Sequence, residues 1–119
     1  MPLKSTFFTA WLLISMLFIS ACSQGDSNVA WQKINQGAVI LDVRTPSEYK
    51  SGHLPNAKLI PVNELEQRLS ELGGNKTRPI VVYCKSGGRS ARAQSILLAN
   101  GYTDVVNGGG YSSLMSSKP

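Results

Sequence analysis

Residues 80–92, with the sequence Ile-Val-Val-Tyr-Cys-Lys-Ser-Gly-Gly-Arg-Ser-Ala-Arg, decide the fold of this chain. From Ile80 to Cys84 the residues are rich in β-branched and aromatic side chains, the pattern of a strand buried on both faces. Residues 90–100 then carry apolar side chains at helical spacing. The chain therefore runs from a buried strand through a glycine-rich turn into a helix, and a cysteine lies where the strand meets the turn.

Cys84 has surroundings that favour a reactive thiolate. Free backbone N–H groups in a glycine-rich turn and at a helix N-terminus point toward an anion held between them. Such surroundings lower a thiol pKa from roughly 8.5 into a range of about 3.5 to 7.5. A buried structural cysteine is the alternative, since free cysteine is among the most buried residue types. The turn around Cys84 favours the interpretation as an active site.

A second apolar run, over residues 39–43, predicts a neighbouring central strand. Asp42 and Arg44 lie at its C-terminal end, where ligands gather in open α/β sheets. We expect these two side chains to support the loop around the cysteine rather than to react. A helix start follows, with Thr45 as the N-cap and Glu48 able to bond back to it.

The rest of the chain predicts strands and helices in alternation. The segments are a helix over 29–36, a short extended piece at 59–61, a helix ending before Gly73, a helix over 91–100 and a strand over 102–106. Asn28, Asn63 and Ser90 are the expected helix caps. Residues 107–110, Asn-Gly-Gly-Gly, predict an irregular turn, and the tail from Tyr111 predicts at most one short helical turn. We expect an α/β fold with a mainly parallel sheet of four to five short strands flanked by helices.

The N-terminal region has the layout of an export signal. An apolar segment over residues 7–19 follows Lys4 and is short for a membrane span, which needs about 20 residues. It closes on Ile19-Ser20-Ala21-Cys22, which resembles the lipobox of bacterial lipoproteins. That resemblance implies a signal peptide over 1–21, a lipid on Cys22, a tether over 22–28 and a domain over 29–119. An uncleaved N-terminal anchor is the alternative.

Either interpretation places the domain outside the cytoplasm. We expect a lipid-anchored protein of the bacterial cell envelope that faces the periplasm and attaches to the membrane through Cys22. Ser23 stands where many inner-membrane lipoproteins have aspartate, which favours the outer membrane. A lipidated Cys22 would leave Cys84 as the only thiol of the mature chain, so no internal disulfide is expected.

The charge pattern indicates small anions rather than nucleic acid. The 119 residues, enough for one domain, carry a net charge of +5, but only 16% are charged and no run of basic residues occurs. No acid lies between Glu71 and Asp104, an interval with five basic residues, so the field around the cysteine should be positive.

His53 is the only histidine, which with one free cysteine gives no ligand set for zinc. We expect His53 to bond within its loop rather than to act as a base.

Several separate motifs together resemble a rhodanese domain. They are Leu41-Asp42-Val43-Arg44, Glu48-Tyr49, Gly52-His53-Leu54-Pro55-Asn56-Ala57, Val82-Tyr83-Cys84 with Gly87, Arg89 and Ser90, and Gly109-Gly110. The resemblance runs from about Trp31 to Leu114. The small size and the export signal are most similar to single-domain exported rhodaneses of the phage shock protein E type.

The resemblance implies a sulfurtransferase in which Cys84 takes a sulfane sulfur from a small anionic donor such as thiosulfate and holds it as a persulfide. A thiol or cyanide would then accept the sulfur, with no metal or organic cofactor, and we expect a monomer. The implied binding loop consists of Lys85, Ser86, Gly87, Gly88, Arg89 and Ser90. Within it, Lys85 would act electrostatically at the rim. Arg89 would either hold the donor with two hydrogen bonds or brace the loop by pairing with an acid such as Asp42.

Three other functions remain open at this stage. Cysteine-dependent phosphatases and arsenate reductases of this architecture use Cys-x5-Arg, whereas Cys84 and Arg89 give Cys-x4-Arg, a shorter loop that suits one sulfur atom better than a phosphate. A noncatalytic rhodanese-like binding module would not need Cys84. A disulfide redox protein would need a second nearby cysteine.

The chain also departs from the rhodanese pattern. Leu114 stands near a position that is commonly tryptophan, and the closing helix is expected to be short or missing.

Overall fold

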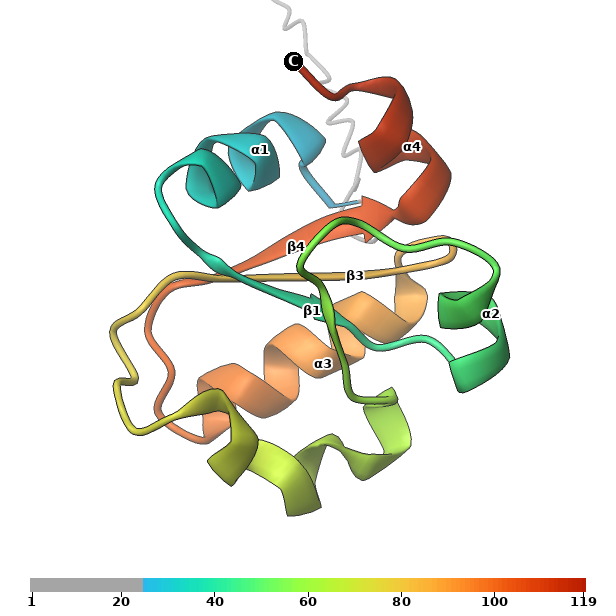
Figure 1. Ribbon diagram of the computed structural model, residues 1–119. Coiled ribbons are helices and arrows are strands. Elements are labelled where there is room, and N and C mark those ends of the chain that lie inside the picture. The colour runs from blue at the N-terminus through green and yellow to red at the C-terminus, as the bar shows by residue number, and fades with distance from the viewer. Residues whose placement is uncertain (1–24) are drawn as a thin grey trace, which may run out of the picture.

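The computed structural model describes residues 25–119, so the predicted signal peptide and lipidation site lie outside the described residues. Four parallel strands form one sheet in the order β2-β1-β3-β4 (Figure 1). The strands are β1 Val39–Asp42, β2 Lys58–Leu59, β3 Ile80–Cys84 and β4 Val105–Gly110. The helices are α1 Ser27–Asn35, α2 Pro46–Lys50, the 3₁₀ helix η1 Val62–Leu72, α3 Gly88–Ala99 and α4 Tyr111–Ser116. Within residues 25–119, no helix is long and apolar enough to cross a membrane.

Helices cover both faces of the sheet, with α1 and α4 on one side and α3 and η1 on the other (Figure 1). The alternation of side chains along β3 divides the core accordingly. Ile80 and Val82 pack toward α3 and η1, whereas Val81 and Tyr83 pack toward α1 and α4. Every residue of β3 is buried, as the apolar run predicts for a central parallel strand.

The pairing of β3 with β1 brings the two predicted functional segments together. Asp42 at the end of β1 is in register with Tyr83, the residue before Cys84. Both strands therefore end at the same edge of the sheet, beside α2 (Figure 1). Cys84 therefore lies where the C-terminal ends of the strands meet, the place at which open α/β sheets bind their ligands.

The caps predicted for α1 and η1 are wrong. Asp26, not Asn28, caps α1, and its carboxylate accepts from the backbone N–H groups of Asn28 and Val29 at 3.1 Å each. The 3₁₀ helix begins at Val62 after Pro61 and has no side-chain cap. Proline fixes the backbone angle at this entry, and the Glu64 N–H bonds to the Pro61 carbonyl at 2.9 Å, so Asn63 is not needed as a cap.

The predicted irregular turn at residues 107–110 is also wrong, because these residues continue β4. The glycines are required by close packing at Gly108 and Gly110 and by a φ of +86° at Gly109, rather than by a reversal of the chain. A Cβ atom on Gly110 would lie 2.5 Å from the Lys85 carbonyl oxygen, and the pairing of β3 with β4 shifts register between Val82 and Cys84. The strand thus passes directly against the loop that follows Cys84. Helix α4 comes next and is longer than the single short turn expected.

Candidate active site

The loop after β3 folds around the sulfur of Cys84. The Sγ atom accepts from the backbone N–H of Gly87 at 2.9 Å and from that of Ser90 at 3.3 Å, and it lies 3.4 Å from the Ser90 hydroxyl. The Cys84 side chain is buried. Burial alone would raise the pKa of this thiol, but hydrogen bonds from the Ser90 hydroxyl and from the N–H groups of Ser90, Gly87 and Ser86 outweigh it and lower the pKa. The site therefore stabilises a thiolate.

The glycine-rich sequence lets the loop take this shape. Gly87 has a φ of +105°, in the left-handed region that favours glycine, and it is the N-cap of α3. Ser90 is therefore not the helix cap that the sequence indicated. It lies in the first turn of α3, fully buried, with its N–H directed at the sulfur. The helix begins two residues earlier than Ser90, which directs more backbone donors toward Cys84.

Arg89 lies beside the loop and is bound to a carboxylate that the sequence analysis did not pair with it. Its Nη1 and Nη2 atoms donate to the two oxygens of Glu48 at 2.7 and 2.9 Å. Glu48 also accepts from the Thr45 backbone at 3.0 Å, which completes the predicted capping box of α2. Hydrogen bonds from Arg89 lower the pKa of Glu48 to about 2. The suggested bracing partner Asp42 is thus replaced by Glu48.

Asp42 is not available to Arg89 because it is bound elsewhere. Arg44 donates to both of its carboxylate oxygens, at 2.9 Å from Nε and 2.7 Å from Nη2. The Tyr83 hydroxyl donates to Asp42 at 2.7 Å and accepts from the Leu54 N–H at 3.0 Å. Arg44 also donates to the Gly52 carbonyl at 2.6 Å. The pair therefore ties the end of β1 to the following loop.

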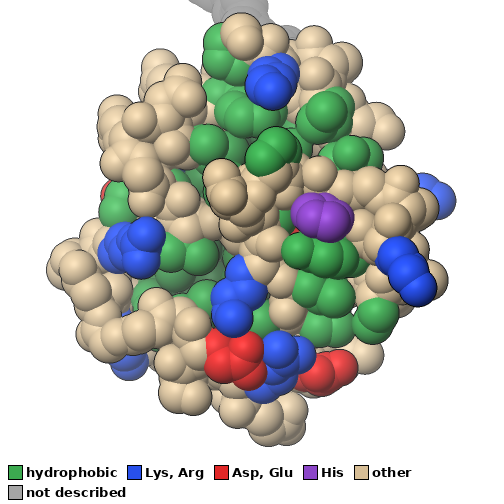
Figure 2. Space-filling model, in the orientation of Figure 1, with side chains coloured by type: hydrophobic (Ala, Val, Ile, Leu, Met, Phe, Trp, Pro, Cys, Tyr) green, Lys and Arg blue, Asp and Glu red, His purple; other side chains and the backbone are tan. Residues whose placement is uncertain are grey.

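His53 is bonded within that same loop, as the sequence suggests. Its Nδ1 lies 2.7 Å from the Tyr49 carbonyl, and its ring stacks on the Tyr49 ring with centroids 3.6 Å apart. Because a carbonyl only accepts, Nδ1 carries the proton in this arrangement. Figure 2 shows the single histidine at the surface beside hydrophobic side chains. On this face the basic side chains are scattered rather than gathered into one patch.

A hollow of about 340 Å³ adjoins the loop of Cys84. It is lined by Lys85, Ser86, Gly110, Ser112 and Ser113, all of which are exposed except the buried Gly110. The two serines of α4 are residues that the sequence analysis missed, and their place just after the Gly109-Gly110 motif is the signal that could have found them. The hollow brings a lysine and three hydroxyl groups next to the reactive loop.

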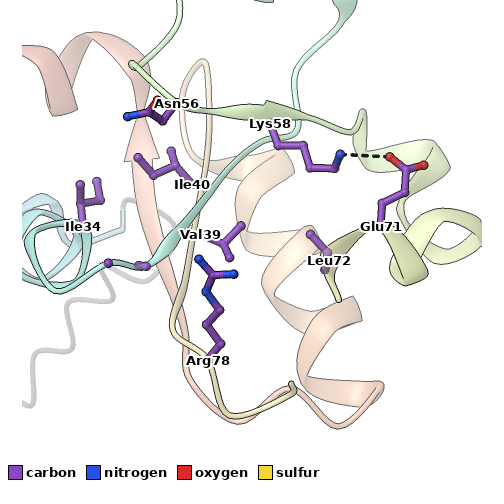
Figure 3. Close-up of a pocket in the computed structure, with 10 residues that line it drawn as sticks. Ile34, Val39, Ile40, Asn56, Lys58, Glu71, Leu72 and Arg78 are labelled. Carbon is purple, nitrogen blue, oxygen red and sulfur yellow. Dashed lines mark ion pairs between the residues drawn. The ribbon is translucent and has the colours of Figure 1, made fainter. Parts of the chain in front are cut away.

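Another hollow, of about 430 Å³, lies at the opposite end of β1 (Figure 3). It is lined by apolar and polar side chains, with Arg78 directed toward Val39 and an ion pair at its rim between Lys58 and Glu71, 3.3 Å apart. No residue of the loop 85–90 contributes to it. It is therefore separate from the site of Cys84.

Comparison with known proteins agrees with this geometry. A family model described as "Rhodanese-like domain" matches residues 26–116. Protein YqhL of Bacillus subtilis is 40% identical over 70 residues, covering 59% of this chain and 54% of that protein. Thiosulfate sulfurtransferase PspE of Escherichia coli is 36% identical over 78 residues, covering 66% of this chain and 75% of PspE.

A solved structure described as a rhodanese with anions from E. coli superposes with a TM-score of 0.64 at 34% identity, covering 70% of this chain and 95% of that one. The chain therefore belongs to the rhodanese family. This finding confirms the family that the separate sequence motifs indicated and the α/β fold that the alternation of strands and helices predicted. The segment matched in YqhL is about half of that protein, so what the relatives do is carried over to this chain only as a proposal.

Proposed function

We propose that this chain is a sulfurtransferase that moves a sulfane sulfur from thiosulfate or a similar donor to a thiophilic acceptor through a persulfide on Cys84. The observation that carries the proposal is the sulfur of Cys84 held by the Gly87 and Ser90 N–H groups, with a lowered thiol pKa. Relatives named thiosulfate sulfurtransferase, such as PspE, support the same reaction class.

The chemistry is a two-step exchange at sulfur. The Cys84 thiolate attacks the outer sulfur of thiosulfate, a new S–S bond forms, and the donor's S–S bond breaks as sulfite leaves with the bonding electron pair. A thiolate or cyanide then attacks the terminal sulfur of the persulfide and Cys84 leaves as a thiolate. The N–H groups around the loop would stabilise the anionic sulfur at both stages. No oxidant, metal or organic cofactor enters either step.

The anionic donor would enter through the hollow beside Lys85. Lys85 and Ser86 with the serines of α4 offer a positive charge and hydroxyl donors to the sulfonate end of thiosulfate. Arg89 is held by Glu48 at rest. We propose that it braces the loop in the free protein and exchanges one hydrogen bond for the donor, because its side chain is about a third exposed, at 36%.

The proposed location is the periplasmic side of the bacterial envelope, with a lipid on Cys22 as the membrane anchor and the outer membrane as the favoured site. The lipobox-like Ile19-Ser20-Ala21-Cys22 supports this proposal. Radiolabelled fatty acid should enter the wild-type chain in cells and should not enter the Cys22→Ala variant. Labelling that persists in the variant would contradict the anchor.

The decisive test of the reaction is mass spectrometry of the chain lacking residues 1–21 after incubation with thiosulfate. We expect the mass of one added sulfur atom on Cys84, its loss on addition of cyanide, and no adduct in Cys84→Ser. An absent adduct together with hydrolysis of an aryl phosphate would favour the phosphatase alternative. A wild-type chain with no activity, whose partner binding is unchanged by Cys84→Ser, would favour a noncatalytic module.

A further inference from the structure

Asn107 lies in β4 behind the loop of Cys84, and its side chain bonds to two segments of the site. The Oδ1 atom accepts from the Ser90 hydroxyl at 2.7 Å and from the Gly109 N–H at 2.9 Å. The Nδ2 atom lies 3.5 Å from the Gly87 carbonyl. Asn107 is only 7% exposed, and its backbone carbonyl accepts from the Asp26 N–H at 2.9 Å. The carboxamide is therefore fixed within a buried network.

The hydroxyl of Ser90 has one proton and three possible acceptors. They are Asn107 Oδ1 at 2.7 Å, the Gly87 carbonyl at 3.0 Å and the Cys84 sulfur at 3.4 Å. Only one can take the proton in a linear hydrogen bond at any moment. The protonation state of the sulfur decides which of these acceptors the hydroxyl proton prefers. A thiol donates to the hydroxyl oxygen, and the hydroxyl proton then points to Asn107.

A sulfur anion reverses this preference because it can only accept. The Ser90 hydroxyl turned to the sulfur forms a charge-assisted hydrogen bond, which is stronger than one between neutral groups. Asn107 Oδ1 still accepts from Gly109 after the turn. No buried acceptor is thus left without a partner in either state, and the usual penalty for an unsatisfied polar group is avoided.

We propose that Asn107 is a positioning residue for the sulfur chemistry: its carboxamide oxygen holds the Ser90 hydroxyl while Cys84 is a thiol and releases it to the sulfur once the sulfur is an anion. The inference rests on the proposed function, in which Cys84 reacts as a thiolate. The hydroxyl rotates without giving up its proton, and the proton lost by Cys84 passes to solvent.

The neutral carboxamide is the feature that makes the hydroxyl releasable. A carboxylate at position 107 would bind the hydroxyl proton more strongly and would place a second negative charge behind the sulfur. An apolar side chain at position 107 would remove one acceptor, so the Ser90 hydroxyl could donate only to the sulfur or to the Gly87 carbonyl. The substitutions Asn107→Asp and Asn107→Leu should therefore shift the reactivity of Cys84 in opposite directions.

The test is the pH dependence of Cys84 alkylation by iodoacetamide, which needs no sulfur donor. We expect Asn107→Asp to raise the pKa seen in this profile by about one unit, which slows alkylation by about tenfold wherever the pH lies below the pKa of both proteins. We expect Asn107→Leu to lower it. In a Ser90→Ala background the Leu substitution should have no effect on the profile, because the hydroxyl through which it acts is gone.

An equal effect of Asn107→Leu in both backgrounds would overturn the proposal, since it would show that the residue acts through packing alone. Asn107→Asp is close to isosteric, so it gives an answer even if the Leu variant does not fold, and an unchanged profile for the Asp variant would also overturn the proposal. If the wild-type chain transfers sulfur but the Asn107 substitutions leave the alkylation profile unchanged, this inference alone is contradicted. A low thiol pKa without persulfide formation would contradict only the proposed function.

Discussion

Arg44 and Arg89 each bind a carboxylate with two nitrogen atoms, but their surroundings differ. Arg44 and Asp42 lie inside the protein, with side chains 6% and 0% exposed. Arg89 and Glu48 lie at the rim, with side chains 36% and 25% exposed. Removing one partner of a buried pair leaves an uncompensated charge, whereas an exposed pair contributes little to stability. The first pair therefore belongs to the scaffold, and the second is the pair that can exchange partners in the proposed reaction.

Asp42→Asn should have the largest effect, because it leaves the Arg44 guanidinium buried without a negative partner. We expect a loss of about 3–5 kcal/mol in the free energy of unfolding. Urea denaturation, analysed by linear extrapolation, measures this loss. A destabilisation no greater than that of Glu48→Gln would show that the buried pair is not part of the scaffold.

Tyr83→Phe tests the same buried region by removing one hydroxyl. The change takes a hydrogen bond from Asp42 and leaves the Leu54 N–H without its acceptor. An unsatisfied buried donor costs about 1–3 kcal/mol, which should appear in the urea midpoint. Persulfide formation on Cys84 should persist in the folded variant. A lost reaction with unchanged stability would place Tyr83 in the chemistry instead.

Glu48→Gln breaks the exposed pair and should cost at most about 1 kcal/mol of stability. Its larger consequence is expected in donor binding, because Arg89 no longer has to leave a carboxylate to reach an anion. We expect the KM for thiosulfate to fall by about threefold, which corresponds to the ~0.6 kcal/mol of an exposed ion pair. Steady-state kinetics with cyanide as acceptor measures this change. A rise in KM would show that Arg89 serves only to brace the loop.

Local patterns were enough to predict the parts of the site that are close in sequence. The strand ending at Cys84, the glycine turn after it and the Thr45 capping box all depend on neighbouring residues. The pairing of Arg89 with Glu48 joins residues 41 positions apart, and the rhodanese-like motifs named both segments without indicating their contact.

The wrong prediction of an irregular turn over residues 107–110 has a different cause. Three consecutive glycines weaken a strand when they are exposed, so the sequence favoured a turn. In the folded protein the missing side chains let β4 approach the Lys85 carbonyl and the side chain of Val81. This approach and the pairing of β4 with β3 bring Asn107 against Ser90, which is a tertiary contact that no local pattern encodes.

The pH dependence of stability provides the finest test of the exposed pair. The pKa of Glu48 is lowered to about 2 by Arg89, whereas an unfolded glutamate titrates near 4.3. A lowered pKa means that the pair's contribution is fully present above about pH 4.3 and is lost as the pH falls toward 2. Because the pair is partly exposed, this contribution is at most about 1 kcal/mol. The urea midpoints of wild type and Glu48→Gln should therefore differ at pH 5 and converge near pH 2. Comparing the two proteins cancels the titration of the other carboxylates. A difference in urea midpoint that stays constant between pH 5 and pH 2 would show that the contact with Arg89 does not stabilise the protein through the charge of Glu48.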